Sequence, residues 1–239
     1  NVTVAGIRRS PSSEAPLESY MLKGIGEWTN REGLTEDDIQ KKIEEFSPDV
    51  ILVSGWLDSV YLKVASKFKG TETCVVGMSD APWRGDIRQQ VAIKLKHFLH
   101  QKWYDVIWVS GERQATFARQ LGFTGTKLWQ GVYACNWDAF HDAAKSDRGR
   151  NNTFLYVGRL TEAKDIETLA NGYAEYRKSV SEPWQLKCIG KGKQDDLIRN
   201  IPGIEIQGFV QPEMLPDAMA DASAFILPSK HEPWGVALQ

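Results

Sequence analysis

The stretch Asn152-Thr-Phe-Leu-Tyr-Val-Gly158, followed by Arg159-Leu-Thr-Glu-Ala-Lys164-Asp165, decides the fold. Its first part is a short apolar run typical of a buried strand, its second part is a turn with two cations, and a helix opens after it. The closing stretch 228–239 has a related form, with a strand end, the carboxylate of Glu232 and then Gly235. Two cations after one strand and a carboxylate after another suit a ligand that carries both phosphates and hydroxyls.

Apolar runs and amphipathic helices alternate along the whole chain, in two series separated by the polar, charged segment 141–151. In the first series we expect strands at 2–7, 49–54, 73–78, 105–110 and 126–132, and helices at 35–46, 58–68, 87–101 and 111–121, with residues 8–34 mostly in loops. In the second series we expect strands at 153–157, 185–190, 203–207 and 223–227, and helices at 164–178, 193–199 and 213–220.

Fully apolar strands that alternate with helices are typical of parallel sheets covered on both faces. The sequence therefore predicts an α/β fold of two doubly wound, Rossmann-like domains, 1–145 and 146–239, that face one another across a cleft.

The composition excludes several classes of protein. The 239 residues are 42% hydrophobic and 25% charged, as in globular proteins, and the net charge of −2 gives no reason to expect a nucleic-acid partner. Cys74, Cys135 and Cys188 are odd in number and far apart, which favours reduced, buried thiols and a cytoplasmic protein. No apolar run approaches the roughly 20 residues that span a bilayer, no signal peptide opens the chain, and the four histidines have no zinc spacing.

Several candidate binding residues of the second series follow directly after strand ends, where ligands bind in open α/β sheets. They are Arg159 and Lys164, the Gly190-Lys-Gly192 turn, Gly208-Phe-Val210, and Glu232 with Gly235. Glycines let a ligand approach the backbone, and cations offset the charge of a diphosphate. Taken singly, the glycines also fit a tight turn, the cations and Glu232 a solvated surface, and Phe209 the core. Their shared position favours the binding site.

Four runs, in this order, resemble the C-terminal half of retaining glycosyltransferases of the GT-B fold, in the large family 4 (group 1) type. They are FLYVGRLTEAKDIETLANGY, the IGKG turn, GFVQPEMLPDAMADASAFILPS and EPWGVAL. Upstream, DVIWVSGERQATFARQLGF and GVYACNWDAF resemble the end of that family's first domain. The resemblance covers roughly residues 50 to 239, and the segment before residue 50 matches only in outline.

The resemblance implies a role for each matching position. Arg159 and Lys164 stand where the family binds the donor's diphosphate and stabilises the leaving phosphate, and Glu232 stands where a carboxylate contacts the sugar hydroxyls. The remaining positions form the nucleotide-sugar site: Gly158, Gly190 and Gly192 against the nucleotide, Phe209 and Val210 at the base, and Gly235 and Val236 as N–H donors to sugar and phosphate.

The sequence departs from the family pattern in three places. The second carboxylate of the family's Glu-x7-Glu motif would be residue 240, while the chain ends at Gln239, and the first domain begins without the family's opening strand and glycine-rich loop. We therefore expect a chain truncated at both ends, with an acceptor-side domain that lacks its first strand and an incomplete nucleotide-sugar domain. Where the family often has His-Asp, this chain has Ser79-Asp80. Asp80 either orients the acceptor or touches the donor sugar, or it only caps a turn.

The helix expected at 87–101 has an apolar face of Val91, Leu95, Phe98 and Leu99. Around it stand Arg84, Arg88, Lys94, Lys96 and Lys102, against the single acid Asp86. Two interpretations stay open. The helix packs its apolar face on the core and leaves a solvated basic side, or it makes a peripheral contact with an anionic membrane, at the inner face of the cell membrane.

These features predict a retaining glycosyltransferase, of hexosyl or related type. It moves a sugar from a UDP- or GDP-linked donor to an unidentified sugar, lipid or small-molecule acceptor. No covalent cofactor and no metal are expected, since the chain has no Asp-x-Asp. Two alternatives remain: a UDP-sugar epimerase of the same architecture, and a catalytically dead fragment that binds nucleotide sugars. A dehydrogenase fits less well, because the Gly190-Lys-Gly192 turn lacks the third glycine and the acidic residue that would hold a ribose.

Overall fold

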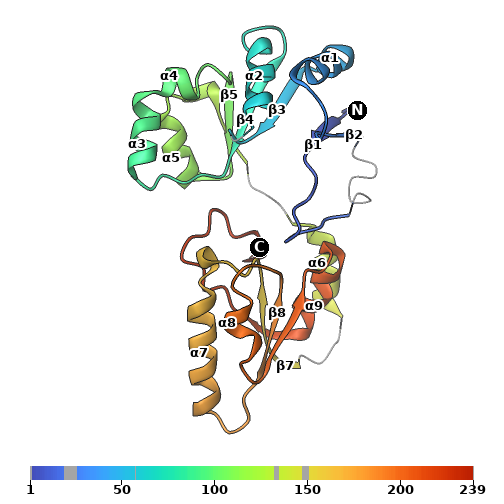
Figure 1. Cartoon of the computed structure of the whole chain (residues 1–239), viewed down its shortest axis with the longest axis vertical. Helices are drawn as coiled ribbons and strands as arrows, with labels where there is room; N and C mark the ends of the chain where they lie inside the picture. Colours follow the sequence, from blue (N-terminus) through green and yellow to red (C-terminus); the bar gives the residue numbers. More distant parts are fainter. Residues whose placement is uncertain (1, 19–25, 57, 132–134, 147–150, 239) are drawn as a thin grey trace. The chain divides into compact units, whose positions relative to one another are not determined.

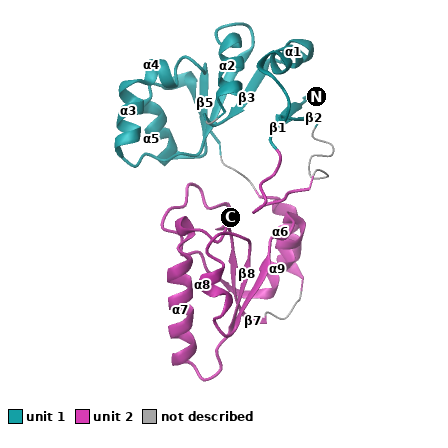
Figure 2. Cartoon of the chain, in the orientation of Figure 1, with its two compact units in different colours: residues 1–9, 26–133 teal, residues 10–25, 134–239 magenta. Residues whose placement is uncertain are grey.

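The computed structural model describes residues 2–18, 26–56, 58–131, 135–146 and 151–238 (Figure 1). The chain forms two compact units, 1–9 with 26–133 and 10–25 with 134–239 (Figure 2). This division differs from the expected boundary at 145/146. Helix α6 (Trp137–Lys145) packs on α9 (Leu215–Asp221), so it joins the second unit rather than the first.

The first unit contains a four-stranded sheet in the order β3-β4-β5-β6, with every neighbouring pair parallel, as expected. Its strands are β3 (Val50–Ser54), β4 (Cys74–Ser79), β5 (Val106–Val109) and β6 (Leu128–Gln130). Its helices are α1 (Glu36–Phe46), α2 (Ser59–Phe68), α3 (Ile87–Lys94), α4 (Lys96–Leu99) and α5 (Glu112–Gln120), with the short turn η2 (Gly125–Lys127) before β6. Apolar residues of the strands, such as Val75 and Ile107, pack against Ala115 and Leu121 in one core.

Two expectations for the first unit are wrong. The run 2–7 is not a buried strand, because β1 (Ala5–Arg8) lies in a separate two-stranded sheet and Val2 is exposed. Its parallel partner is β2 (Glu27–Asn30), within a segment expected to be loop. The strand expected at 49–54 is present but lies at the edge of its sheet, with Val50 and Leu52 exposed.

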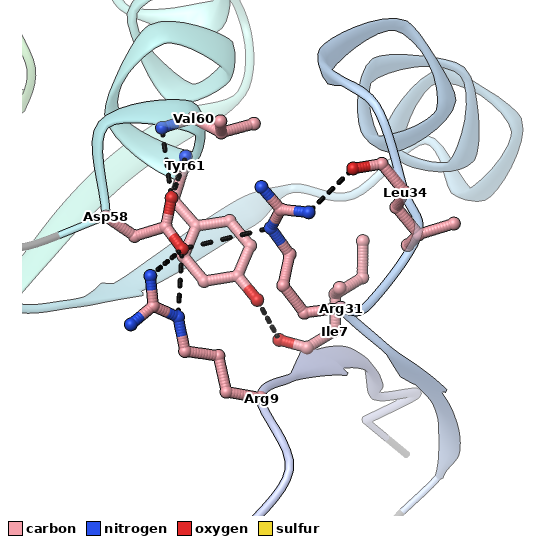
Figure 3. A network of polar contacts seen from close by, with 7 residues as sticks. All are labelled: Ile7, Arg9, Arg31, Leu34, Asp58, Val60 and Tyr61. Atoms are coloured by element: carbon pink, nitrogen blue, oxygen red, sulfur yellow. Dashed lines mark hydrogen bonds and ion pairs between the residues drawn. The ribbon is translucent and has the colours of Figure 1, made fainter.

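A polar network joins β1 and β2 to the start of α2 (Figure 3). One oxygen of the Asp58 carboxylate accepts from the Val60 and Tyr61 amides and caps α2, and the other accepts from the Arg9 guanidinium at 2.7 Å. Arg31 lies 3.8 Å from the same carboxylate, and the Tyr61 hydroxyl donates to the Ile7 carbonyl at 3.1 Å. Burial raises the pKa of Asp58, but the hydrogen bonds from Arg9 and from the two amides together lower it by more. The pKa of Asp58 therefore lies below its usual value.

The second unit contains a parallel sheet in the order β10-β7-β8-β9. Its strands are β7 (Asn151–Val157), β8 (Gln185–Ile189), β9 (Ile204–Gly208) and β10 (Ala222–Phe225). Besides α6 and α9 it has α7 (Ile166–Ser179) and α8 (Asp196–Arg199), and the short turns η3 (Glu162–Lys164), η4 (Pro212–Met214) and η5 (Val236–Leu238). Tyr156, Leu160, Ile166 and Leu186 are fully buried between sheet and helices. The α/β class with parallel sheets is confirmed.

Candidate functional site

The strand order of the second unit marks one position for a ligand. From β7 the chain runs to β8 and β9 on one side, and β10 then pairs with β7 on its other side. Ligands of open α/β sheets bind beyond the carboxyl ends of the strands, at the point where the strand order reverses. Here that point lies between β7 and β10. Arg159 and Lys164 follow β7, and Glu232 follows β10.

Two ion pairs join the loops that leave β7 and β10. The Lys164 ammonium pairs with the Glu232 carboxylate, and Lys230 Nζ lies 3.3 Å from Asp165 Oδ1. Both side chains of the first pair are largely shielded from solvent, whereas Lys230 is half exposed. The structure therefore brings together Lys164 and Glu232, which are 68 residues apart in the sequence.

Asp165 fixes the turn that presents Lys164. It has a positive φ of 54°, which an aspartate tolerates better than most residues, and it stands between η3 and α7. The Thr168 hydroxyl donates to Asp165 Oδ2 at 3.0 Å. Although burial raises the pKa of Asp165, the hydrogen bonds from Thr168 and Lys230 lower it more. An ionised Asp165 can then keep both Lys230 and the start of α7 in place.

Gly235 sets the conformation of the loop that carries Glu232. It is buried and has a φ of +71°, and a Cβ added there would lie 3.2 Å from Glu232 Cγ. The loop then turns into η5, with the Leu238 amide donating to the Gly235 carbonyl at 2.8 Å. The side chain of Val236, at the start of η5, points into solvent. A side chain at 235 would therefore be strained by this φ and would crowd Glu232.

The glycines after β7 and β8 allow the loops to approach one another. A Cβ at Gly190, where φ is +141°, would lie 1.9 Å from the Gly158 carbonyl oxygen, and one at Gly192 would lie 2.2 Å from the Leu160 oxygen. Backbone hydrogen bonds join Leu160 to Lys191, and Gln194 to Leu160, each at 3.0 Å. Packing between loops is therefore a reason for these glycines that the sequence did not reveal.

A cavity of about 510 Å³ lies beside these loops, within the second unit. Its walls are residues 190–193, Asp195, Arg199 and residues 206–208, together with Ser13 and Glu14. Gln211 holds the segment that contains Ser13 and Glu14, since its Nε2 donates to the Pro16 carbonyl at 3.1 Å. Sequence reasoning missed Ser13 and Glu14 because residues 8–34 show no pattern beyond that of a loop. Phe209 and Val210 are half-buried and follow directly after the cavity wall.

The other predicted cation, Arg159, is in contact with the buried Tyr156. Its hydroxyl donates to the Arg159 carbonyl at 2.8 Å and would lie 2.9 Å from a Cβ at Gly158. Burial raises the pKa of Tyr156, Cys188 and Glu232 raise it further, and Arg159 lowers it. The charges of Arg159 and Glu232 therefore both act on the Tyr156 phenol, although the Arg159 side chain itself is exposed.

Asp80 lies in the first unit, directly after β4, and is exposed. The Ser79 hydroxyl accepts from the Ala81 amide at 3.2 Å, and the Asp80 carbonyl accepts from Gln114 Nε2 at 3.3 Å. Ser79 thus caps this turn, and the role of Asp80 stays a prediction. In the described part of the chain, no group of three or more His, Cys, Asp or Glu side chains is placed to hold a metal. None of the described helices combines the length and the apolar character needed to cross a membrane.

Residues 151–239 match the family model "Glycosyl transferases group 1". The fold is that of GT-B glycosyltransferases. Solved structures with this fold include a pneumococcal O-GlcNAc transferase, GtfA, in complex with UDP and GlcNAc (TM-score 0.61, 14% identity, 85% of this chain and 42% of that one). They also include a sucrose-phosphate synthase from Thermosynechococcus elongatus (0.63, 17%, 88% and 59%). A third is Anabaena HepE in complex with UDP and glucose (0.62, 13%, 89% and 63%).

The chain spans between about two fifths and three fifths of the length of these three structures. No curated protein sequence matches the chain significantly. At this level of identity the likeness concerns the fold alone, while the group 1 match concerns the segment that carries Lys164 and Glu232.

Proposed function

We propose that this chain is part of a retaining glycosyltransferase that moves a hexosyl or related group from a UDP- or GDP-linked donor to an acceptor. One observation carries the proposal: Lys164 and Glu232 pair at the point where the strand order reverses, inside the segment that matches the group 1 model. GtfA and HepE, which share the fold, are both in complex with UDP.

The chemistry follows from the charges at this site. Transfer breaks the bond between the anomeric carbon and the donor's phosphate oxygen, and the electron pair stays on the departing diphosphate. Lys164 and Arg159, with the N–H groups of Gly235 and Val236, stabilise that charge, and Glu232 accepts hydrogen bonds from the sugar hydroxyls. When the donor binds, the Lys164 ammonium turns from the Glu232 carboxylate to the phosphates, so both side chains already lie at the site before charge develops.

The acceptor completes the reaction in this proposal. Its hydroxyl oxygen forms a new bond to the anomeric carbon from the face that the diphosphate leaves, so the configuration is retained. Its proton passes to the leaving phosphate oxygen. Neither a metal nor a covalent cofactor takes part in this step, because cations of the chain offset the charge.

We assign the cavity beside Gly190 and Gly192 to the nucleotide, with Phe209 and Val210 at the base. Lys191 and Lys193 line it and contribute positive charge. A cytoplasmic location fits the three free cysteines, since thiols persist in reducing compartments.

Substitution of Lys164 tests the assignment in the full-length protein. Lys164→Ala should lower sugar transfer by about 10²-fold or more, as for other preorganised groups that stabilise developing charge. Lys178→Ala is the matched control, because Lys178 also pairs with a carboxylate of the second unit, that of Glu175, on the surface of α7. Unchanged turnover in Lys164→Ala would exclude the proposed role.

Two other outcomes point to the alternatives. Epimerised donor or free glycal formed without an acceptor would favour the epimerase. Binding of UDP or GDP in calorimetry, without hydrolysis or transfer of the corresponding sugar, would favour a binding fragment that has lost turnover.

A further inference from the structure

The segment formed by α3 and α4 has two apolar faces, and only one of them is covered. Ala92, Ile93 and Trp103 pack against the core of the first unit, and His100 is buried beside them. The second face is the exposed stripe, formed by Ile87, Val91, Leu95, Phe98 and Leu99, with exposed fractions of 79%, 46%, 44%, 70% and 41%. The stripe runs over two short helices rather than the single helix expected at 87–101, because α3 ends at Lys94, α4 begins at Lys96, and Leu95 between them has non-helical angles of φ −101° and ψ 18°.

Of the two interpretations of this segment, the one in which the predicted apolar face packs on the core is wrong. The sequence allowed Val91, Leu95, Phe98 and Leu99 to be the face that packs on the core, but all four point into solvent. The face that packs on the core is instead the one that carries Ala92 and Ile93. Packing on the core therefore leaves a second apolar surface of α3 and α4 exposed.

The charges around the exposed stripe are basic, apart from Asp86, which caps the start of α3. Arg88 directly follows Ile87 and Lys94 directly precedes Leu95 in the chain, and both cations are exposed. Residues 87–104 contain no Asp or Glu. Among the ion pairs of the described residues, none involves Arg84, Arg88, Lys94 or Lys102. Lys102 instead lies over the ring of Trp103, with its ammonium 3.9 Å from the centroid.

We propose that the exposed stripe docks on an anionic phospholipid surface. Helices α3 and α4 lie along the surface, the apolar side chains of the stripe enter the boundary between headgroups and acyl chains, and the nearby cations contact lipid phosphates. A second copy of the chain fits less well, because symmetric pairing through the stripe would bring the same cations against one another. This inference does not rest on the proposed glycosyl transfer, since docking needs no donor.

Co-sedimentation of the full-length protein with vesicles tests the inference without nucleotide. We expect binding to phosphatidylglycerol–phosphatidylcholine vesicles, weaker binding at high salt, and little binding to phosphatidylcholine alone. Phe98→Ser combined with Ile87→Ser should lower binding by about tenfold or more. Arg88→Gln combined with Lys94→Gln should lower it by about 25-fold, at about fivefold for each cation near the surface.

Leu52→Ser is the matched control, because Leu52 is an apolar residue of the same unit, 52% exposed, and lies on β3 away from the stripe. It should leave vesicle binding unchanged. All variants alter exposed side chains, and circular dichroism checks that they fold. The inference is overturned if the protein binds neither vesicle, or if binding is unaffected by Phe98→Ser with Ile87→Ser. It is also overturned if gel filtration shows self-association that this double variant abolishes, which would assign the stripe to a second copy.

Discussion

Gly192→Ala separates two roles of the glycines in the second unit. A Cβ at this position would lie 2.2 Å from the Leu160 carbonyl oxygen, a distance well under the 3.0 Å that real contacts of this kind essentially never fall below. The two loops would therefore have to part by about 1 Å, which would break the hydrogen bonds that join Leu160 to Lys191 and Gln194 at 3.0 Å.

The expected cost follows from those two bonds. Each contributes about 1 kcal/mol net, and the buried Leu160 backbone would lose its partners, so the free energy of unfolding should fall by about 2–3 kcal/mol. For a chain of this size that corresponds to a Tm lower by about 5–10 °C. Gly172→Ala is the control. It stands inside α7 with nothing within 4 Å of an added Cβ, so it should leave stability unchanged or raise it by about 0.5–1 kcal/mol.

Thermal unfolding is measured first without nucleotide and then with UDP. If Gly192 served only to let a ligand approach the backbone, Gly192→Ala would keep the wild-type Tm in the absence of UDP and lose only binding. That result would refute the packing argument. A lower Tm without UDP, with Gly172→Ala at or above wild type, would support it.

Two further predictions concern buried or networked charges. Burial lowers the pKa of His100 from 6.5 to about 4, and its Nδ1 has no hydrogen-bond partner among the described residues. The fold therefore binds this proton more weakly than the unfolded chain does, and His100 should cost up to roughly 3 kcal/mol of stability as the pH falls from 6.5 towards 4. His100→Leu should remove that part of the pH dependence in urea unfolding, and an unchanged slope would contradict the burial argument. Asp58→Asn keeps an acceptor for the cap of α2 but loses the charge opposite Arg9, which is 64% exposed, so it should cost at most about 1 kcal/mol. Asp58→Ala loses the cap as well and should cost about 1–2 kcal/mol. Since the pKa of Asp58 is lowered, its contribution should persist above about pH 4 and be lost below it. Equal unfolding midpoints for the two Asp58 variants would argue against the cap.

The sequence predicted the parallel sheets well, because a fully buried strand carries its own signal. Val106–Val109 and Thr153–Val157 are continuous apolar or β-branched runs, and the strands β5 and β7 that contain them lie within a residue or two of their predicted places. The edges of the sheets were harder to predict. Val50–Ser54 is as apolar as the central strands, yet it is an edge strand, and composition does not distinguish the two positions. Glu27–Asn30 is short and polar, so nothing in its pattern indicated a strand.

For the site, position after a strand end was sufficient to select Lys164 and Glu232, and the structure pairs them. What the sequence could not reveal is which loop touches which. The approach of Leu160 to Gly192 depends on the register of β7 and β8, and the wall formed by Ser13 and Glu14 depends on a contact with Gln211 almost 200 residues away. Such contacts leave no local pattern, because each partner alone has the composition of an ordinary loop.

The Lys164–Glu232 pair differs from exposed ion pairs in its position and in its shielding from solvent. An exposed pair such as Lys178–Glu175 contributes little to stability, so its presence calls for no special role. Lys164 and Glu232 instead lie on loops from two neighbouring strands and are largely shielded from solvent. A ligand with only phosphates would have to displace the carboxylate from Lys164, and a ligand with only hydroxyls would gain nothing from the cation. A donor that joins a diphosphate to a hydroxylated sugar can engage both side chains at once, because the cation turns to the phosphates and the carboxylate to the hydroxyls. The free energy lost when the ion pair separates is then offset by new contacts of both Lys164 and Glu232. The site therefore favours a nucleotide sugar over a nucleotide or a sugar alone.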